Sequence, residues 1–134
     1  MLKHTILPLA LAMVLTAGSA IGSDRHVNAT LEPVNGSGVS GIVKLTSLPQ
    51  GGTLITVVAT GLQPGTEYLS LYYENATCEL EPYDEDDVIG RYTADPAGKA
   101  TVTHKLEDDL DEIHSVSVRL GSDFSLVSCA VVNQ

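Results

Sequence analysis

Positive charge is scarce in this sequence. Its 134 residues include seven lysines and arginines against seventeen aspartates and glutamates, so that the formal net charge is −10 at pH 7. A domain of this sign repels phosphate backbones and anionic lipid headgroups. The composition therefore argues against nucleic acids and membrane surfaces as partners. The length suits a single domain.

Long apolar runs are missing beyond the first residues. The chain begins with a basic residue, Lys3, followed by an apolar stretch over 6–15, interrupted only by a proline, and by small residues over 17–20. This order is typical of a secretory signal. The stretch is shorter than the ~20 apolar residues that a bilayer span needs. We predict a signal peptide over 1–22 and an exported domain, periplasmic or secreted, over 23–134. A retained N-terminal membrane anchor is the alternative.

Cysteine is limited to Cys78 and Cys129. In an exported chain, two cysteines are expected to form a disulfide. Closing a loop of about 50 residues stabilises a fold by roughly 4 kcal/mol in the chain-entropy model. A pair of metal-binding thiolates is the alternative, but no further cysteine or histidine lies close to either one in the sequence.

A helical period is also absent, and the pattern is that of strands. Segments rich in β-branched residues alternate with polar positions and are separated by Gly, Pro, Asn and Asp clusters. They predict eight strands, at 26–33, 39–46, 53–60, 66–74, 88–94, 99–105, 113–120 and 124–132. The acidic segment 106–113 is expected to be a loop with one helical turn. Eight short strands at this spacing predict an all-β sandwich or flattened barrel.

The longest predicted connection, residues 75–87, is rich in acids. Long loops in compact domains are usually functional or disordered. Hard cations such as calcium prefer several oxygen ligands, and a second acidic group follows at 107–112. Neither group has the spacing of an EF-hand. The pattern favours a solvated acidic loop, and the weak calcium candidates within it are Glu81, Asp84, Asp86 and Asp87.

Four motifs resemble those of Cu,Zn superoxide dismutases, in the same order. Residues 38–43 look like the second strand of that family, and 59–65 like the turn before its copper-binding strand. Residues 90–102 contain a glycine, a Thr-Ala-Asp triplet, a second glycine and an alternating strand in the family's ungapped register. Residues 125–132 resemble the last strand with its cysteine. The resemblance implies an eight-stranded Greek-key β-sandwich, and it pairs the last-strand cysteine with one in a loop.

The metal ligands of that family are missing. Its copper strand carries two histidines two residues apart, which leave one face of the strand, and Ser70 and Tyr72 stand there instead. Copper in such sites requires imidazole. The position of the zinc aspartate falls near Val88, that of the last copper histidine near Arg119, and that of the anion-steering arginine at Leu126. We therefore predict no catalytic residues and no copper or zinc cofactor.

Alternation divides the fourth predicted strand into two faces. We assign Leu69 and Leu71 to the core and Tyr68, Ser70 and Tyr72 to an exposed face. Such a tyrosine face would be a lid over the vacated metal site or a binding patch. The first of these is the preferred interpretation.

These observations predict an exported, non-catalytic binding or structural module on a Cu,Zn superoxide dismutase-like fold, with an unknown protein or small-molecule partner. One alternative is an enzyme of that family with a rearranged metal site formed by His26, His104 and His114. A second is a calcium-stabilised adhesion-type sandwich. Residues 62–68 also resemble a fibronectin type III turn, but that turn has about 60 residues before it and about 30 after, and the proportions here are reversed.

Overall fold

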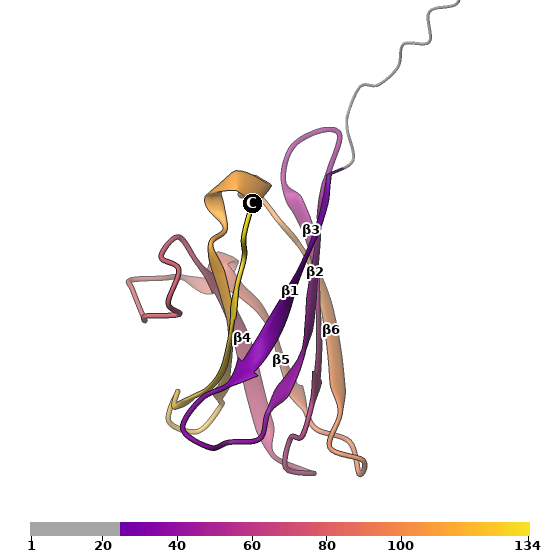
Figure 1. The fold of residues 1–134 in the computed structure, drawn as a ribbon, viewed down its shortest axis with the longest axis vertical. Coiled ribbons are helices and arrows are strands. Elements are labelled where there is room, and N and C mark those ends of the chain that lie inside the picture. The colour runs from indigo at the N-terminus through magenta and orange to yellow at the C-terminus, as the bar shows by residue number, and fades with distance from the viewer. Residues whose placement is uncertain (1–24) are drawn as a thin grey trace, which may run out of the picture.

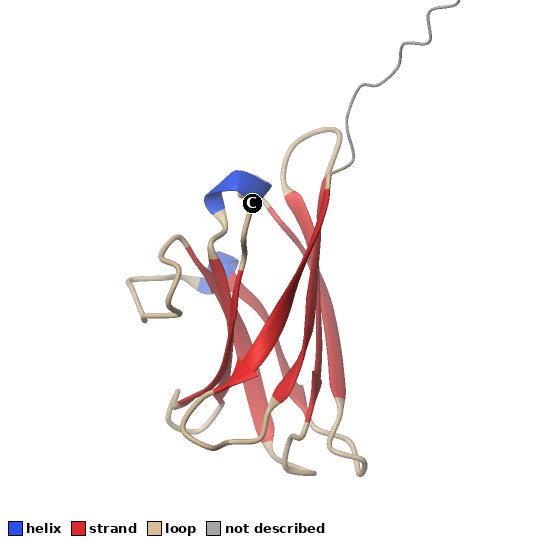
Figure 2. Cartoon of the chain, viewed as in Figure 1, coloured by secondary structure: helices blue, strands red, loops and turns tan. Residues whose placement is uncertain are grey.

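The structure, a computed structural model, describes residues 25–134, and these form an all-β domain (Figure 1). Its strands are β1 (His26–Pro33), β2 (Ser40–Ser47), β3 (Thr53–Thr60), β4 (Glu67–Tyr73), β5 (Val88–Thr93), β6 (Ala100–Leu106), β7 (Ser115–Leu120) and β8 (Leu126–Val131). Two single-turn 3₁₀ helices lie in the connections, η1 (Glu85–Asp87) and η2 (Leu110–Glu112) (Figure 2). The predicted signal over 1–22 lies outside the described residues. Over 25–134 no helix has the length and apolar character needed to cross a membrane.

The strands form one antiparallel sheet in the order β5-β4-β7-β8-β1-β2-β3-β6. The sheet folds over on itself, so that β1, β2, β3 and β6 face the layer of β4, β5, β7 and β8 (Figure 1). The two end strands, β5 and β6, contact each other without a backbone ladder, and the barrel is therefore nearly closed. At this seam Gly90 lies against Val102: a Cβ on Gly90 would stand 2.4 Å from a Val102 methyl group.

The main core fills the space between the two layers. On β3, for example, Ile55 and Val57 are buried while Leu54 faces outward, which is the period of two expected for a half-buried strand. Every predicted strand end lies within two residues of the observed one, and the predicted helical turn in the segment 106–113 is present as η2. The prediction of an all-β sandwich or flattened barrel is confirmed.

Strand β4 is buried on both faces, and one prediction was therefore wrong. Tyr68, Ser70 and Tyr72, expected on an exposed face, are only 3%, 0% and 7% exposed. Both tyrosines belong to the main core. The opposite face, with Leu69 and Leu71, packs in a second apolar cluster beneath the loop that follows β4. The reason is that the tyrosine face points into the main core between the two layers, while the loop after β4 covers the opposite, outer face.

Candidate functional site

The predicted disulfide is present and fixes the loop after β4. It joins Cys78 in that loop to Cys129 in β8, with the two Cα atoms 6.0 Å apart. Cys78 is 1% exposed, and its backbone N–H donates to Ser115 Oγ at 3.1 Å. The middle of the loop over 74–87 is therefore held against β7 and β8.

A buried arginine holds the same segment from a second side. Arg119 on β7 is 7% exposed. Its guanidinium donates to the carbonyl oxygen of Cys78 at 2.7 Å, to that of Phe124 at 2.6 Å and to Tyr73 Oη at 2.9 Å. Within residues 25–134 no carboxylate forms an ion pair with it. Its charge is satisfied by neutral oxygens from the loop after β4, from the β7–β8 turn and from Tyr73 at the end of β4.

Three of the four calcium candidates, Glu81, Asp84 and Asp87, have local hydrogen-bond partners for their carboxylates. The Glu81 carboxylate accepts a hydrogen bond from the backbone N–H of Glu74 at 3.2 Å. Asp84 accepts from the backbone N–H of Asp86 at 3.0 Å, and Asp87 accepts from that of Asp84 at 3.3 Å. Asp84 and Asp87 thus form the capping box of η1. The local role of these two acids is to satisfy the free backbone groups of a short helix.

A different set of carboxylates converges on η2. Asp109, Asp111 and Glu112 are exposed, and each offers an oxygen within 4.8 Å of the others. Among the described residues this is the one group of three or more potential metal ligands that lie so close together. It includes none of the histidines of the domain, which are all exposed: His26, His104 and His114.

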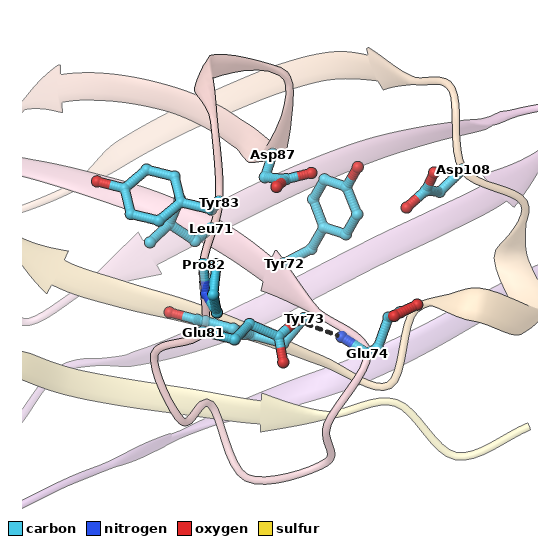
Figure 3. A pocket seen from close by; sticks show the side chains of 9 residues that line it. All are labelled: Leu71, Tyr72, Tyr73, Glu74, Glu81, Pro82, Tyr83, Asp87 and Asp108. Carbon is cyan, nitrogen blue, oxygen red and sulfur yellow. Dashed lines mark hydrogen bonds between the residues drawn. The ribbon is translucent and has the colours of Figure 1, made fainter.

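A pocket opens at the end of β4, between the loop over 74–87 and the segment that joins β6 to η2. Its cavity volume is about 170 Å³. The polar part of its lining consists of three tyrosines and four acids: Tyr72, Tyr73, Tyr83, Glu74, Glu81, Asp87 and Asp108 (Figure 3). Leu71 and Pro82 complete it, and no lysine, arginine or histidine of residues 25–134 takes part.

The phenol of Tyr72 stands between two of these acids, Asp87 and Asp108 (Figure 3). Burial, and then the charges of Asp108 and Asp87, raise the pKa of Tyr72 far above its usual range, so the hydroxyl stays a donor. A phenol has a single proton to donate, and the Tyr72 hydroxyl faces both carboxylates. Burial and the charge of Glu112 raise the pKa of Asp108, although the nearby Tyr72 hydroxyl lowers it. The pocket therefore concentrates negative charge around one neutral donor.

The other two polar side chains on the inner face of β4 are paired within the domain. Ser70 Oγ and Tyr92 Oη are 2.7 Å apart, and burial raises the pKa of Tyr92 to about 12. The Tyr68 hydroxyl accepts from the backbone N–H of Gln63 at 2.8 Å. Neither Ser70 nor Tyr72 is therefore free to serve as an outward-facing ligand.

Sequence reasoning identified parts of this pocket without assembling them. It named Glu81 and Asp87 as cation candidates and noted the acidic group that contains Asp108, but it did not bring the two groups together. Tyr72 is the residue at which they meet, and it was assigned to an exposed face. Alternation with a period of two gives no information about contacts between segments that are far apart in the sequence.

Comparison with known proteins adds no assignment. No family model matches this sequence, and no curated protein matches it significantly. Function is therefore inferred from the geometry of the chain itself.

Proposed function

We propose that this chain is an exported, non-catalytic binding module on a Greek-key sandwich of the Cu,Zn superoxide dismutase type. The strand order supports this, because the connections from β3 to β4 and from β6 to β7 cross between the two layers while β1, β2 and β3 follow one another. The disulfide joins the loop after β4 to the last strand, as the resemblance implies. A buried disulfide is compatible with export.

The observation that carries the non-catalytic part is the interior position of Ser70 and Tyr72. These residues stand where the resemblance expects two copper histidines; Ser70 is hydrogen-bonded to Tyr92, and the buried Tyr72 ring lies between two carboxylates. Dismutation by copper requires imidazole ligands and an open coordination position. A serine and a protonated tyrosine in a packed core supply neither.

The pocket at the end of β4 is the proposed binding site. Concave sites that combine aromatic walls, a few polar groups and titratable residues with shifted pKa values are the usual location of ligand binding. Here the shifted groups, Tyr72 and Asp108, lie in the lining of the cavity. The disulfide and Arg119 hold the loop that forms one wall, so the cavity is preorganised.

The turn before β4 does not alter this proposal. The Tyr68 hydroxyl bonds back to Gln63, as the tyrosine corner of immunoglobulin-like sandwiches does. In those sandwiches the corner introduces the penultimate strand. Here three strands precede β4 and four follow it.

The non-catalytic part is tested with protein incubated with copper and zinc and then desalted. We expect superoxide consumption no faster than that of the same amount of free copper, with an active Cu,Zn dismutase as the positive control. Turnover within about tenfold of the control, lost in His104→Ala or His114→Ala, would show that a real metal site exists.

The binding part is tested by ¹⁵N–¹H spectra of the protein titrated with small cationic, neutral and anionic fragments. We expect shifts grouped around the pocket for at least one class. If no fragment of any class shifts these resonances, the pocket is not a binding site.

A further inference from the structure

The negative charge of the pocket has no matching cation. Glu74, Glu81, Asp87 and Asp108 line it, and none of them forms an ion pair within residues 25–134. The one ion pair of that region joins Arg91 to the exposed Glu85, outside the lining. Burial, and then the charges of Glu112, Asp87 and Asp109, raise the pKa of Asp108, so the carboxyl group retains its proton more strongly.

The spacing of these carboxylates suits a cation larger than a metal ion. No three of them offer oxygens within 4.8 Å of one another, whereas the group on η2 does. Calcium requires six to eight oxygen ligands at about 2.4 Å. The four acids instead come from two separate segments: Glu74, Glu81 and Asp87 from the loop over 74–87, and Asp108 from the connection between β6 and η2.

The remaining walls are aromatic and apolar, which favours an organic cation. Tyrosine rings attract ammonium groups electrostatically, and alkyl stems bury well against rings and prolines while the charged end stays solvated. Tyr83 and Pro82 supply such a wall. A cavity of about 170 Å³ has the volume of roughly six water molecules and is smaller than the usual range for whole metabolites. It fits a single side chain.

An apolar ledge beside the pocket indicates that this side chain belongs to a polypeptide. Leu80 and Tyr83 are 49% and 36% exposed on the same loop. The Tyr83 ring packs against Phe124, with ring centroids 6.2 Å apart. Exposed large apolar side chains beside a polar depression are characteristic of protein contact surfaces. A partner with one basic residue and adjacent aliphatic residues would complement both features.

We propose that the pocket receives a lysine side chain of a partner polypeptide, with its ammonium group among the carboxylates and its alkyl stem against Tyr83. This inference rests on the proposed binding function of the same pocket. An ammonium group directs three donors in different directions, which suits acids that lie at separate positions around the cavity. The planar fork of an arginine suits one carboxylate approached in its own plane.

The test is a titration of the ¹⁵N-labelled protein with acetyl-Leu-Lys-Leu-amide. The matched control is the same peptide with Nε-acetyl-lysine, which keeps the stem and removes the charge. We expect shifts grouped around Tyr72, Tyr83 and Asp108, and binding about tenfold weaker for the acetylated peptide, because it cannot neutralise the acids. Equal affinity of the two peptides would overturn the proposal.

Two variants separate the pocket from the overall charge. Asp108→Asn removes one pocket carboxylate and keeps an acceptor near Tyr72. We expect this variant to bind the lysine peptide with an affinity about fivefold lower than that of the wild-type protein. Glu107→Gln removes one negative charge from the exposed neighbouring residue outside the pocket. The affinity of this variant for the lysine peptide should be within about twofold of the wild-type affinity. Equal losses in both variants would show that only the general field of the protein attracts the peptide.

A further titration, with n-butylammonium, distinguishes a polypeptide partner from a free amine. If n-butylammonium binds as tightly as the peptide, the ledge contributes nothing and the proposed partner class is wrong. If the lysine peptide fails to bind while a neutral or anionic fragment shifts the pocket resonances, this inference alone is overturned. If nothing binds at all, the proposed binding function fails with it.

Discussion

Replacing Arg119 by methionine would remove a buried guanidinium while keeping a long stem in the same space. Three hydrogen bonds would be lost, to the carbonyl oxygens of Cys78 and Phe124 and to Tyr73 Oη. The Tyr73 hydroxyl keeps its bond with Ser117 Oγ at 2.8 Å, but the two carbonyls are left to find other donors. A hydrogen bond to a charged group contributes about 1.5–3 kcal/mol, and an unsatisfied buried carbonyl costs about 1–3 kcal/mol.

These contributions do not simply add, because burying the cation has its own desolvation cost of several kcal/mol. Removing the guanidinium also removes this desolvation cost, which offsets part of the lost hydrogen-bond stabilisation. We therefore expect Arg119→Met to lower the free energy of unfolding by about 3 kcal/mol, at the upper end of the usual range for single substitutions. The loss should come from the loop over 74–87 and the β7–β8 turn, since the arginine joins these two segments.

The measurement is urea unfolding of the oxidised protein, followed by circular dichroism. With a slope of about 1.5 kcal/mol per M, a loss of about 3 kcal/mol moves the midpoint down by about 2 M. Arg91→Met is the control, because Arg91 forms only an exposed ion pair with Glu85 at 3.1 Å, and such pairs contribute about 0–1 kcal/mol. If Arg119→Met costs no more than the control, the guanidinium does not hold the loop and our reasoning is wrong.

Three further predictions concern the disulfide, one glycine and one carboxyl group. The double variant Cys78→Ser, Cys129→Ser opens a loop with a sequence separation of 51 and should lose about 4 kcal/mol in urea unfolding; a loss below about 1 kcal/mol would contradict the chain-entropy account. Gly41→Ala should cost at least about 2 kcal/mol by the same assay, because a Cβ there would stand 1.9 Å from the carbonyl oxygen of Val58 at a φ of +149°; near-neutral behaviour would show that β2 and β3 can separate. The pKa of Asp108 is higher in the folded than in the unfolded chain, so its ionisation at rising pH costs stability. Asp108→Asn should therefore melt at a higher temperature than the wild-type protein at pH 7. This difference in melting temperature should disappear at about pH 3, below the ordinary pKa of an aspartate. The same difference at both pH values would refute the raised pKa of Asp108.

The strands could be predicted because their information is local. Alternation along β3 or β7 needs only neighbouring residues, and the turns between strands contain glycine and proline at short intervals. The disulfide followed from the number of cysteines and the predicted export. These features are determined by composition and by a period of two, and the structure adds mainly the order in which the strands meet.

Strand β4 and the pocket could not be predicted in the same way. Alternation shows that Leu69 and Tyr68 face opposite sides, but it does not show that a loop covers the outer side. Likewise, Arg119 follows Val118 on β7 and therefore leaves the opposite face, but its burial depends on a loop that is held by a distant cysteine. The approach of Asp108 to Tyr72 depends on how two connections cross the end of the barrel. Each of these features is set by tertiary contacts.

The seam between β5 and β6 has a consequence for how copies of this chain behave at high concentration. There the two layers meet through side chains, with Gly90 against Val102, so backbone amides and carbonyls on both strand edges have no partner strand. Unpaired edges are templates for strand exchange between molecules. The missing Cβ lets the neighbouring strand pack close enough to shield these edges. A larger residue at position 90 would therefore hold β5 and β6 apart and expose both edges to strands of other molecules.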